Sequence, residues 1–558
     1  MPGLDAALPK PRSLAALRRA WQGWQPTLGG TTLALLSSLY FAIAGNAMFW
    51  HASLAGREIG QASTWGFAGA LFVFITAVHF LLLAPLLNRW SSKPLLALLF
   101  IVLGFASFYM QKYGIYLDPS MLRNVLKTDV GEARELFTWD LLPHLLLVTG
   151  LPLLLLSRLR LQPGGLGRTL VTRAGAMVLA AVLGGGAVFL VFQDFASLMR
   201  NNKEIRYLIT PANLAYSLTR VAKAEAAQGP RRPIGTDAAL AASWQQRKKP
   251  ALFVIVVGET ARAANWGLNG YARQTTPELA KRDVINFANV ESCGTNTEVS
   301  VPCLFAPVGR RQYDESLIRG SESLLHVLDR AGFKVLWRDN QSGCKGVCDG
   351  LPSEALSNAG IPALCDGERC LDEVLLHNLD KVLEDGRGNR VIVMHQLGNH
   401  GPAYYKRYPE AFHRFAPTCD SADLRQCSRE QIVNAYDNAL LYTDHVLAST
   451  IDFLKRQEKD YDTAMLYVSD HGESLGENNL FLHGMPYSIA PKEQNHVPMV
   501  MWFSAGYTRD FKLDTACLKA RARQPASHDH VFHSVLGLLD VQTGLYERPF
   551  DLAADCRS

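Results

Sequence analysis

The sequence predicts a membrane part of five transmembrane helices followed by an α/β domain outside the cytoplasm. Three observations lead to this fold class. Five long runs in the first 200 residues contain no Asp, Glu, Lys or Arg, apolar runs alternate with helix-like segments after residue 250, and all ten cysteines follow residue 290. The length of 558 residues also exceeds that of one ordinary domain.

Each charge-free run is long enough to cross a bilayer, which takes about 17 to 25 apolar residues in a helix. The first run is not expected to be a cleaved signal peptide, because no small-residue cleavage site follows a short apolar core. Asn46 and His79 lie within these runs and are interpreted as helix-packing partners, with a functional role as the alternative. We therefore expect a transmembrane domain over residues 1–200 with spans at about 31–50, 66–88, 94–111, 141–157 and 174–193.

Basic residues predict the orientation of these spans. The N-terminus and the second and fourth loops hold ten Lys and Arg, whereas the first and third loops hold five. Because short basic loops stay in the cytoplasm, we expect a cytoplasmic N-terminus and an exported chain after about Asp194. Residues 201–558 carry 40 basic against 43 acidic residues, and this lack of a basic excess argues against a nucleic-acid partner.

The cysteines form an even, clustered set in the exported half, which is typical of disulfides in an oxidising compartment. A zinc–thiolate site is the alternative, but no pair has the CxxC spacing usual for one. Short spacings suggest four local pairs and leave the last two cysteines for each other: Cys293–Cys303, Cys344–Cys348, Cys365–Cys370, Cys419–Cys427 and Cys517–Cys556.

The remainder of the chain is expected to form a bridging helix and linker over 201–249 and a globular domain over 250–558. Within that domain, five apolar runs are predicted to be buried strands: 252–257, 334–337, 391–395, 464–468 and 498–503. They alternate with predicted helices over 317–331, 371–384 and 430–456. This alternation predicts a mostly parallel sheet with helices on both faces.

Carboxylate and imidazole side chains follow three of these strands. Glu259 follows the first, His400 lies in the segment after the third, and Asp470 with His471 follows the fourth. Active sites gather at the carboxyl ends of such strands, and this ligand mixture suits zinc, with manganese as the alternative. Each could also be an ordinary loop residue, but the convergence of three strand ends favours a site.

A turn over 292–303 is rich in hydroxyl groups and lies between Cys293 and Cys303. A disulfide there would hold a nucleophile rigidly, and a metal would lower the pKa of a threonine hydroxyl. Thr295 and Thr297 both qualify by spacing, and both could instead be turn formers.

Four segments resemble a known family: VVGETARAANWGLNGY, SCGTNTEVSVPC, HQLGNHGPAYYKRYP and YVSDHGESLGENNLFLHGMP. They are similar to segments of the lipid A phosphoethanolamine transferases, which include the mobile colistin-resistance enzymes. The resemblance covers essentially the whole chain and implies an alkaline-phosphatase-like periplasmic domain. It also implies one bound zinc ion, with a second as the alternative, and transfer of phosphoethanolamine from phosphatidylethanolamine to lipid A. The protein would be a multi-pass protein of the bacterial inner membrane, and we expect a monomer.

Carried onto this sequence, the resemblance implies roles for single residues. It makes Thr297 the nucleophile, since the family uses the second threonine of its CGTxT motif, and it makes His400 and His483 a second pair around the phosphoryl group. The implied zinc ligands are Glu259, Thr297, Asp470 and His471. The implied phosphoethanolamine contacts are Thr295, Gln341, Ser342 and Lys345, and Lys345 would also stabilise the anionic transition states.

The chain departs from some family members in three places. Gln341 replaces an asparagine, Glu298 puts a carboxylate beside the nucleophile, and the cysteines at 344 and 348 bracket Lys345.

A role for the membrane part follows from the loop between the third and fourth spans. Asn124, Thr128 and Glu132 repeat every four residues, so they would share one face of an amphipathic helix over 119–136. We expect that face to help hold the lipid headgroup, and a solvated helix face is the alternative.

Competing functions are a sulfatase, a phosphoglycerol transferase and a non-catalytic receptor. A sulfatase needs a CxPxR-like motif, which is absent around Thr297, and a receptor would be expected to lose the metal ligands. Core sugars and periplasmic glucans are alternative acceptors, but 483–486 and 490–494 are similar to the lipid A branch. Polymyxin resistance is therefore expected.

Overall fold

The structure is a computed structural model that describes residues 24–128, 130–162, 165–226, 229–384 and 388–557. The chain forms two compact units, one of residues up to 112 with 139–215, the other of 113–138 with 216–558. This division differs from a single boundary at residue 200. The loop 113–138 belongs to the second unit because its side chains pair there, as Arg123 does with Glu315.

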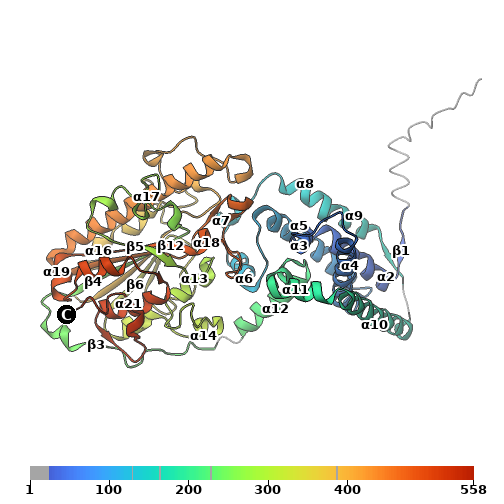
Figure 1. Ribbon diagram of the computed structural model, residues 1–558, viewed down its shortest axis with the longest axis horizontal. Coiled ribbons are helices and arrows are strands. Elements are labelled where there is room, and N and C mark those ends of the chain that lie inside the picture. The colour runs from blue at the N-terminus through green and yellow to red at the C-terminus, as the bar shows by residue number, and fades with distance from the viewer. Residues whose placement is uncertain (1–23, 129, 163–164, 227–228, 385–387, 558) are drawn as a thin grey trace, which may run out of the picture. The chain divides into compact units, whose positions relative to one another are not determined.

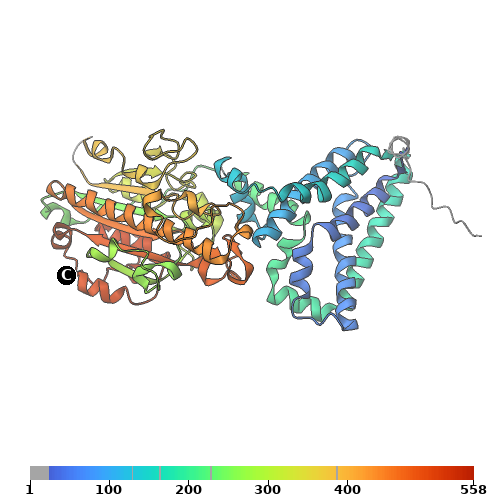
Figure 2. The same ribbon diagram turned by 90° about the horizontal axis from the view of Figure 1, so that it is seen from above.

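The first unit is helical and apolar. Among the described residues, four helical segments are long and apolar enough to cross a membrane, and the pair α2 and α3, bent by 61°, would make a fifth. These helices lie side by side as a bundle (Figure 2). Their bounds are α2 Gly30–Ala44, α3 Ala47–Leu54, α4 Ala62–Leu83, α5 Ser92–Tyr113, the segment Leu141–Arg158 that contains α8 and α9, and α10 Leu166–Leu190.

Asn46 lies at the bend between α2 and α3 and is fully buried. Its amide donates to the carbonyl oxygens of Phe41 at 2.7 Å and Thr210 at 2.9 Å, and its oxygen accepts from the Thr210 N–H at 2.8 Å. These bonds tie the bend between the two helices to the chain at Thr210. Asn46 thus contributes to helix packing, as its sequence position indicates.

The second unit is built on an eight-stranded sheet in the order β13-β5-β12-β9-β4-β8-β6-β7. β12 runs antiparallel to both of its neighbours, and the other pairings are parallel. The strands are β4 Ala251–Gly258, β5 Ile285–Glu291, β6 Lys334–Asp339, β7 Ser353–Ala355, β8 Arg390–His395, β9 Asp462–Ser469, β12 His496–Phe503 and β13 Ala526–Ser527. The mostly parallel α/β domain is confirmed.

Alternation along the central strands explains the two helical layers. Every residue of β4 is buried, and alternate side chains such as Phe253 and Ile255 join one hydrophobic cluster. On that face the cluster continues into α13 (Thr297–Leu304), α15 (Leu324–Arg330) and α21 (Asp529–Leu538). The long helix α17 (Arg429–Arg456) lies across the opposite face (Figure 1). Two-sided burial of this kind requires strands that are apolar throughout, and β4 has that composition.

The folded domain begins before residue 250. β3 (Ala239–Leu240) pairs antiparallel with β14 (Val541–Gln542), and Trp244 packs edge-on against Phe333 and Phe511. The segment expected to be a linker up to 249 therefore contributes a strand and a partly buried aromatic side chain to the second unit.

The five expected disulfides are all present in the described chain: Cys293–Cys303, Cys344–Cys348, Cys365–Cys370, Cys419–Cys427 and Cys517–Cys556. No described cysteine is free.

The continuous helix expected over 119–136 is wrong. The segment forms α6 (Pro119–Lys127) and α7 (Val130–Glu135), because Thr128 takes an extended conformation and ends the first helix. Asn124, Thr128 and Glu132 therefore do not share one uninterrupted helical face.

Candidate active site

Three strands of the second unit end at one cluster of buried polar side chains. Glu259 follows β4, Asp470 and His471 follow β9, and His400 lies in the loop after β8. The first three are fully buried and His400 is nearly so. Because β4, β8 and β9 are parallel neighbours, their carboxyl ends lie at the same edge of the sheet, and the loops that follow converge there.

The hydroxyl-rich turn places Thr297 rather than Thr295 against this cluster. Asn296 caps α13 by accepting the Val299 N–H at 3.1 Å, so Thr297 is the first residue of the helix. The Thr297 hydroxyl lies 3.1 Å from Glu259 Oε2 and 3.4 Å from His471 Nε2. The Thr295 hydroxyl instead donates to the Met485 carbonyl at 2.6 Å. The Cys293–Cys303 bridge closes the turn around both residues.

Glu259, Asp470 and His471 each offer a ligand atom, and these atoms lie within 4.8 Å of one another. Burial first, and then the Glu259 charge, raise the pKa of Asp470 to about 6. Asp470 Oδ2 is buried and has no hydrogen-bond partner. Two carboxylates and an imidazole around one unsatisfied oxygen fit a divalent cation such as zinc, because the ion would offset the repulsion between the carboxylates.

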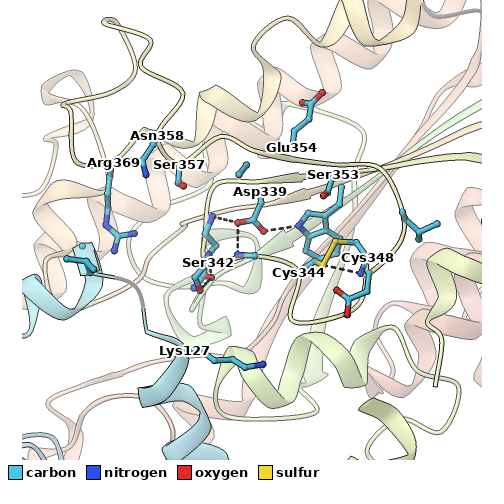
Figure 3. Close-up of a pocket in the computed structure, with 18 of the residues that line it drawn as sticks. Lys127, Asp339, Ser342, Cys344, Cys348, Ser353, Glu354, Ser357, Asn358 and Arg369 are labelled. Carbon is cyan, nitrogen blue, oxygen red and sulfur yellow. Dashed lines mark hydrogen bonds between the residues drawn. A yellow bond between two sulfur atoms is a disulfide. The ribbon is translucent and has the colours of Figure 1, made fainter. Parts of the chain in front are cut away.

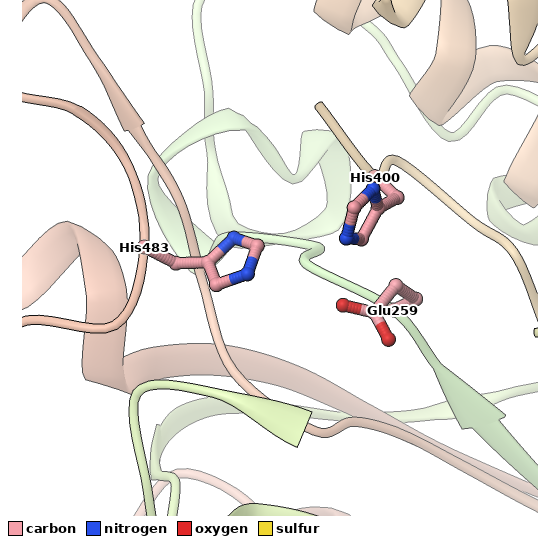
Figure 4. A group of neighbouring side chains, drawn as sticks. All are labelled: Glu259, His400 and His483. Carbon is pink, nitrogen blue, oxygen red and sulfur yellow. The ribbon is translucent and has the colours of Figure 1, made fainter. Parts of the chain in front are cut away.

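A second group of possible ligands consists of Glu259, His400 and His483 (Figure 4). His400 Nε2 lies 2.8 Å from the Glu132 carboxylate of α7. Burial alone would lower the pKa of His400, but the Glu132 charge overcomes it and raises the pKa to about 9. Burial and the charges of His471 and His400 hold the pKa of His483 well below its usual range. The pKa values of the two histidines are therefore shifted in opposite directions.

The other expected phosphoethanolamine contacts lie on the loop after β6. Gln341 is buried, and Ser342 donates to its side-chain oxygen. Lys345 adopts a left-handed backbone conformation, and its ammonium lies 2.6 Å from the Ser342 hydroxyl and 3.3 Å from Glu298. Of the α6–α7 residues, Glu132 reaches the cluster through His400, whereas the Thr128 hydroxyl donates to the Asn124 carbonyl at 2.9 Å.

This chain is similar to known proteins along most of its length. A sequence profile described as Sulfatase matches residues 251–541, and one described as Phosphoethanolamine transferase EptA/EptB matches residues 75–226. The phosphoethanolamine transferase EptA of Escherichia coli K12 is 38% identical over 549 residues, which cover 96% of this chain and 98% of that protein. This chain belongs to the phosphoethanolamine transferase family.

Two further relatives extend the likeness. The phosphatidylethanolamine transferase Mcr-1 of Escherichia coli is 39% identical over 83% of this chain and 86% of that protein. The integral membrane lipooligosaccharide phosphoethanolamine transferase A of Neisseria meningitidis has a TM-score of 0.90 at 36% identity, covering 95% of this chain and all of that structure. The match to a full-length structure confirms the combination of a helical membrane part and an α/β domain.

The cluster of this phosphoethanolamine transferase also contains residues that the sequence reasoning did not select. Glu473 is fully buried 3.4 Å from His483, and burial raises the pKa of its carboxyl to about 8. Glu473 lies in the quoted SDHGES segment, so its proximity to Asp470 and His471 was a usable signal. His395 and Asp339 form a buried pair at 2.9 Å between the ends of β8 and β6. Their separation in the sequence offers no such signal.

Proposed function

We propose that this enzyme transfers phosphoethanolamine from phosphatidylethanolamine to lipid A through a phosphoethanolamine ester of Thr297. The observation that carries the proposal is the Thr297 hydroxyl, which lies 3.1 to 3.4 Å from buried Glu259 and His471. A threonine hydroxyl held against a carboxylate and an imidazole at a strand edge is placed to act as a nucleophile.

Zinc is the proposed cofactor, and Glu259, Thr297, Asp470 and His471 would hold it. When bound, zinc supplies Lewis-acid stabilisation of negative charge on the threonine and phosphoryl oxygens. We propose one ion, because His400 Nε2 lies 2.8 Å from the Glu132 carboxylate and that ring nitrogen is occupied by this contact. Release of Glu132 would make Glu259, His400 and His483 available for a second ion.

The first chemical step forms the covalent ester. Thr297 Oγ attacks the phosphorus of phosphatidylethanolamine, and Glu259 Oε2 accepts the hydroxyl hydrogen at 3.1 Å, so it lies in position to receive that proton. The bond from phosphorus to the glycerol oxygen breaks, and diacylglycerol leaves with a proton from His400. Lys345, His400 and His483 would stabilise the negative charge on the phosphoryl oxygens.

The second step regenerates the threonine. A phosphate oxygen of lipid A attacks the phosphorus of the ester, the bond to Thr297 Oγ breaks, and the electron pair returns to that oxygen, which takes up one proton. The product carries a diphosphate linkage to ethanolamine. Thr295, Gln341, Ser342 and Lys345 would hold the phosphoethanolamine group during both steps, and Glu132 of α7 would contribute through its contact with His400.

Both substrates are lipids, which explains a catalytic domain joined to membrane helices. We propose that the protein lies in the bacterial inner membrane as a monomer with a cytoplasmic N-terminus. The five disulfides support a periplasmic position for the second unit. Addition of an ethanolamine amine would lower the net negative charge of lipid A, so cationic peptides such as polymyxin would bind it less strongly.

The test is mass spectrometry of lipid A from cells that express the native chain, Thr297→Ala or Thr297→Ser at equal membrane levels. We expect a phosphoethanolamine increment with the native chain, a smaller one with Thr297→Ser because a hydroxyl remains, and none with Thr297→Ala. Polymyxin sensitivity should follow the same order. An increment that persists in Thr297→Ala would exclude Thr297 as the nucleophile.

A further inference from the structure

A basic pocket lies on the side of α13 that Glu298 faces, next to the proposed nucleophile. Its volume is about 330 Å³, and its lining includes Arg123, Lys127, Arg319 and Lys345. Glu298 follows Thr297 directly, and its side chain is fully buried. The residue that directly follows the proposed nucleophile in α13 therefore lines the pocket.

Three cations surround the Glu298 carboxylate. Arg319 Nη2 lies at 3.2 Å, Lys345 Nζ at 3.3 Å and Lys127 Nζ at 3.7 Å. Glu315 pairs with Arg319 at 3.3 Å as well, so two carboxylates face these three cations, and the Arg319 and Lys345 side chains are only 9% and 5% exposed. Such buried charges are costly unless an anion shares them.

The remaining charges leave the pocket positive. Arg123, which is 2% exposed and pairs with Glu315, raises the number of lining cations to five together with Arg231. Against them stand three lining carboxylates and Glu315, which pairs with both Arg123 and Arg319, so one positive charge is in excess. Arg231 and Asp349 form a pair at 2.7 Å. Burial and then the neighbouring Arg319 charge lower the pKa of Arg123, as expected where cations are crowded. An anionic phosphate group would offset this excess.

A larger hollow adjoins the pocket (Figure 3). Its volume is about 800 Å³, and it shares Lys127, Ser342, Cys344 and Asp349 with the basic pocket. The side of the hollow away from α6 presents polar side chains, namely Ser353, Glu354, Ser357 and Asn358. Hydroxyl, amide and carboxylate groups can bond to sugar hydroxyls, which both donate and accept.

We propose that the acceptor binds here as a phosphorylated saccharide, with its phosphomonoester in the basic pocket and its sugar in the adjoining hollow. The proposal rests on the proposed function, because it assigns a place to the second substrate of that reaction. It favours a phosphate over a neutral sugar hydroxyl as the attacking group. The acceptor oxygen forms a bond to the phosphorus on Thr297, the phosphorus–Oγ bond breaks, and the Oγ electron pair takes one proton.

The test separates the two half-reactions in the full-length protein in phosphatidylethanolamine-containing nanodiscs. Intact mass reports the phosphoethanolamine adduct on Thr297 without acceptor, and a titration with bisphosphorylated lipid A gives the KM for transfer. Lys127→Gln is the main variant because Lys127 is 45% exposed, so the fold should tolerate the change. Arg319→Gln is the second variant, with Arg319→Lys to restore the charge. Lys381→Gln, an exposed position on α16 (Leu379–Glu384), is the matched control.

We expect Lys127→Gln and Arg319→Gln to raise the acceptor KM by about tenfold or more, as loss of a charge-assisted hydrogen bond would. The rate of adduct formation should change much less, Arg319→Lys should recover part of the loss, and Lys381→Gln should match the native chain. Lipid A stripped of its phosphates should not compete with the intact acceptor.

Three results would overturn the assignment. An acceptor KM within twofold of native in both glutamine variants would show that the pocket does not bind the acceptor. Equal losses in adduct formation and transfer would assign the pocket to the donor. Absence of any adduct in the native chain would instead remove the proposed function, and the acceptor site with it.

Discussion

In the second unit, close contacts between charged side chains shift their pKa values. One such group, a histidine between two acidic side chains, lies away from the candidate active site. On α17, His445 Nδ1 lies 2.8 Å from Glu278, and its Nε2 lies 3.6 Å from Glu373. The hydrogen bond to Glu373 raises the pKa of His445 to about 9, with Glu278 adding to it against the effect of burial. The imidazole is therefore cationic at neutral pH and bridges two acidic side chains.

The contacts of His445 predict that the stability of the folded chain depends on pH. The pKa of His445 is higher in the folded chain than the 6.5 of an unfolded histidine, so the stabilisation is complete below pH 6.5 and is lost as the pH rises through about 9. His445→Gln should lower the Tm at pH 6 and have almost no effect at pH 10, measured by thermal unfolding of the full chain in detergent. A Tm difference that is equal at both pH values would contradict the pairing. Exposed His377→Gln is the control.

Whole elements show which features a single sequence can predict. The β4, β8 and β9 strands were predictable because each is an unbroken apolar run, and Glu259, Asp470 and His471 follow from their strand ends. The antiparallel direction of β12 was not predictable, because the composition of a strand does not indicate its direction in the sheet. The end of α6 at Thr128 escaped prediction because four-residue spacing indicates a helix but not where it stops. The contact between Glu132 and His400 depends on tertiary folding and has no local signal.

The first turn of the long helix α17 contributes to the stability of the second unit. Ser428 caps α17 by accepting the Gln431 N–H at 3.2 Å, and the Gln431 side chain accepts the Ser428 N–H at 2.8 Å. Ser428→Ala should reduce the free energy of unfolding by about 1 kcal/mol, because it leaves a helix N–H without a partner. Ser428→Asp retains an acceptor and should stay near native. Chemical denaturation followed by circular dichroism measures both, and equal stability of all three proteins would exclude a contribution from the cap.

For the molecule as a whole, two of the five disulfides are expected to differ in their effects on stability and on catalysis. Cys517–Cys556 spans 39 residues, whereas Cys344–Cys348 spans 4 and encloses Lys345. The sequence predicted these bridges because most partners are near neighbours, but it could not show that one of them shapes the loop around Lys345.

Removal of these two bridges should therefore have different effects on stability and on transfer. Loop entropy predicts a loss of roughly 4 kcal/mol for Cys517→Ser with Cys556→Ser, but only about 2 kcal/mol for Cys344→Ser with Cys348→Ser. The second pair of substitutions should impair transfer more strongly, because the Lys345 loop would lose its constraint. Denaturation and lipid A mass spectrometry on both double variants provide the measurement. A greater loss of transfer in the Cys517→Ser, Cys556→Ser variant would contradict a role of the Cys344–Cys348 bridge in catalysis.

The catalytic unit is assembled from two stretches of chain, 113–138 and 216–558, with membrane residues between them. The shorter stretch supplies Glu132 to His400, Glu135 to Arg407 and Arg123 to Glu315. A recombination event that exchanged only the C-terminal portion between two relatives would separate these partners. Functional chimaeras should therefore inherit both stretches from the same parent, so the unit of modular exchange in this protein is discontinuous in the gene.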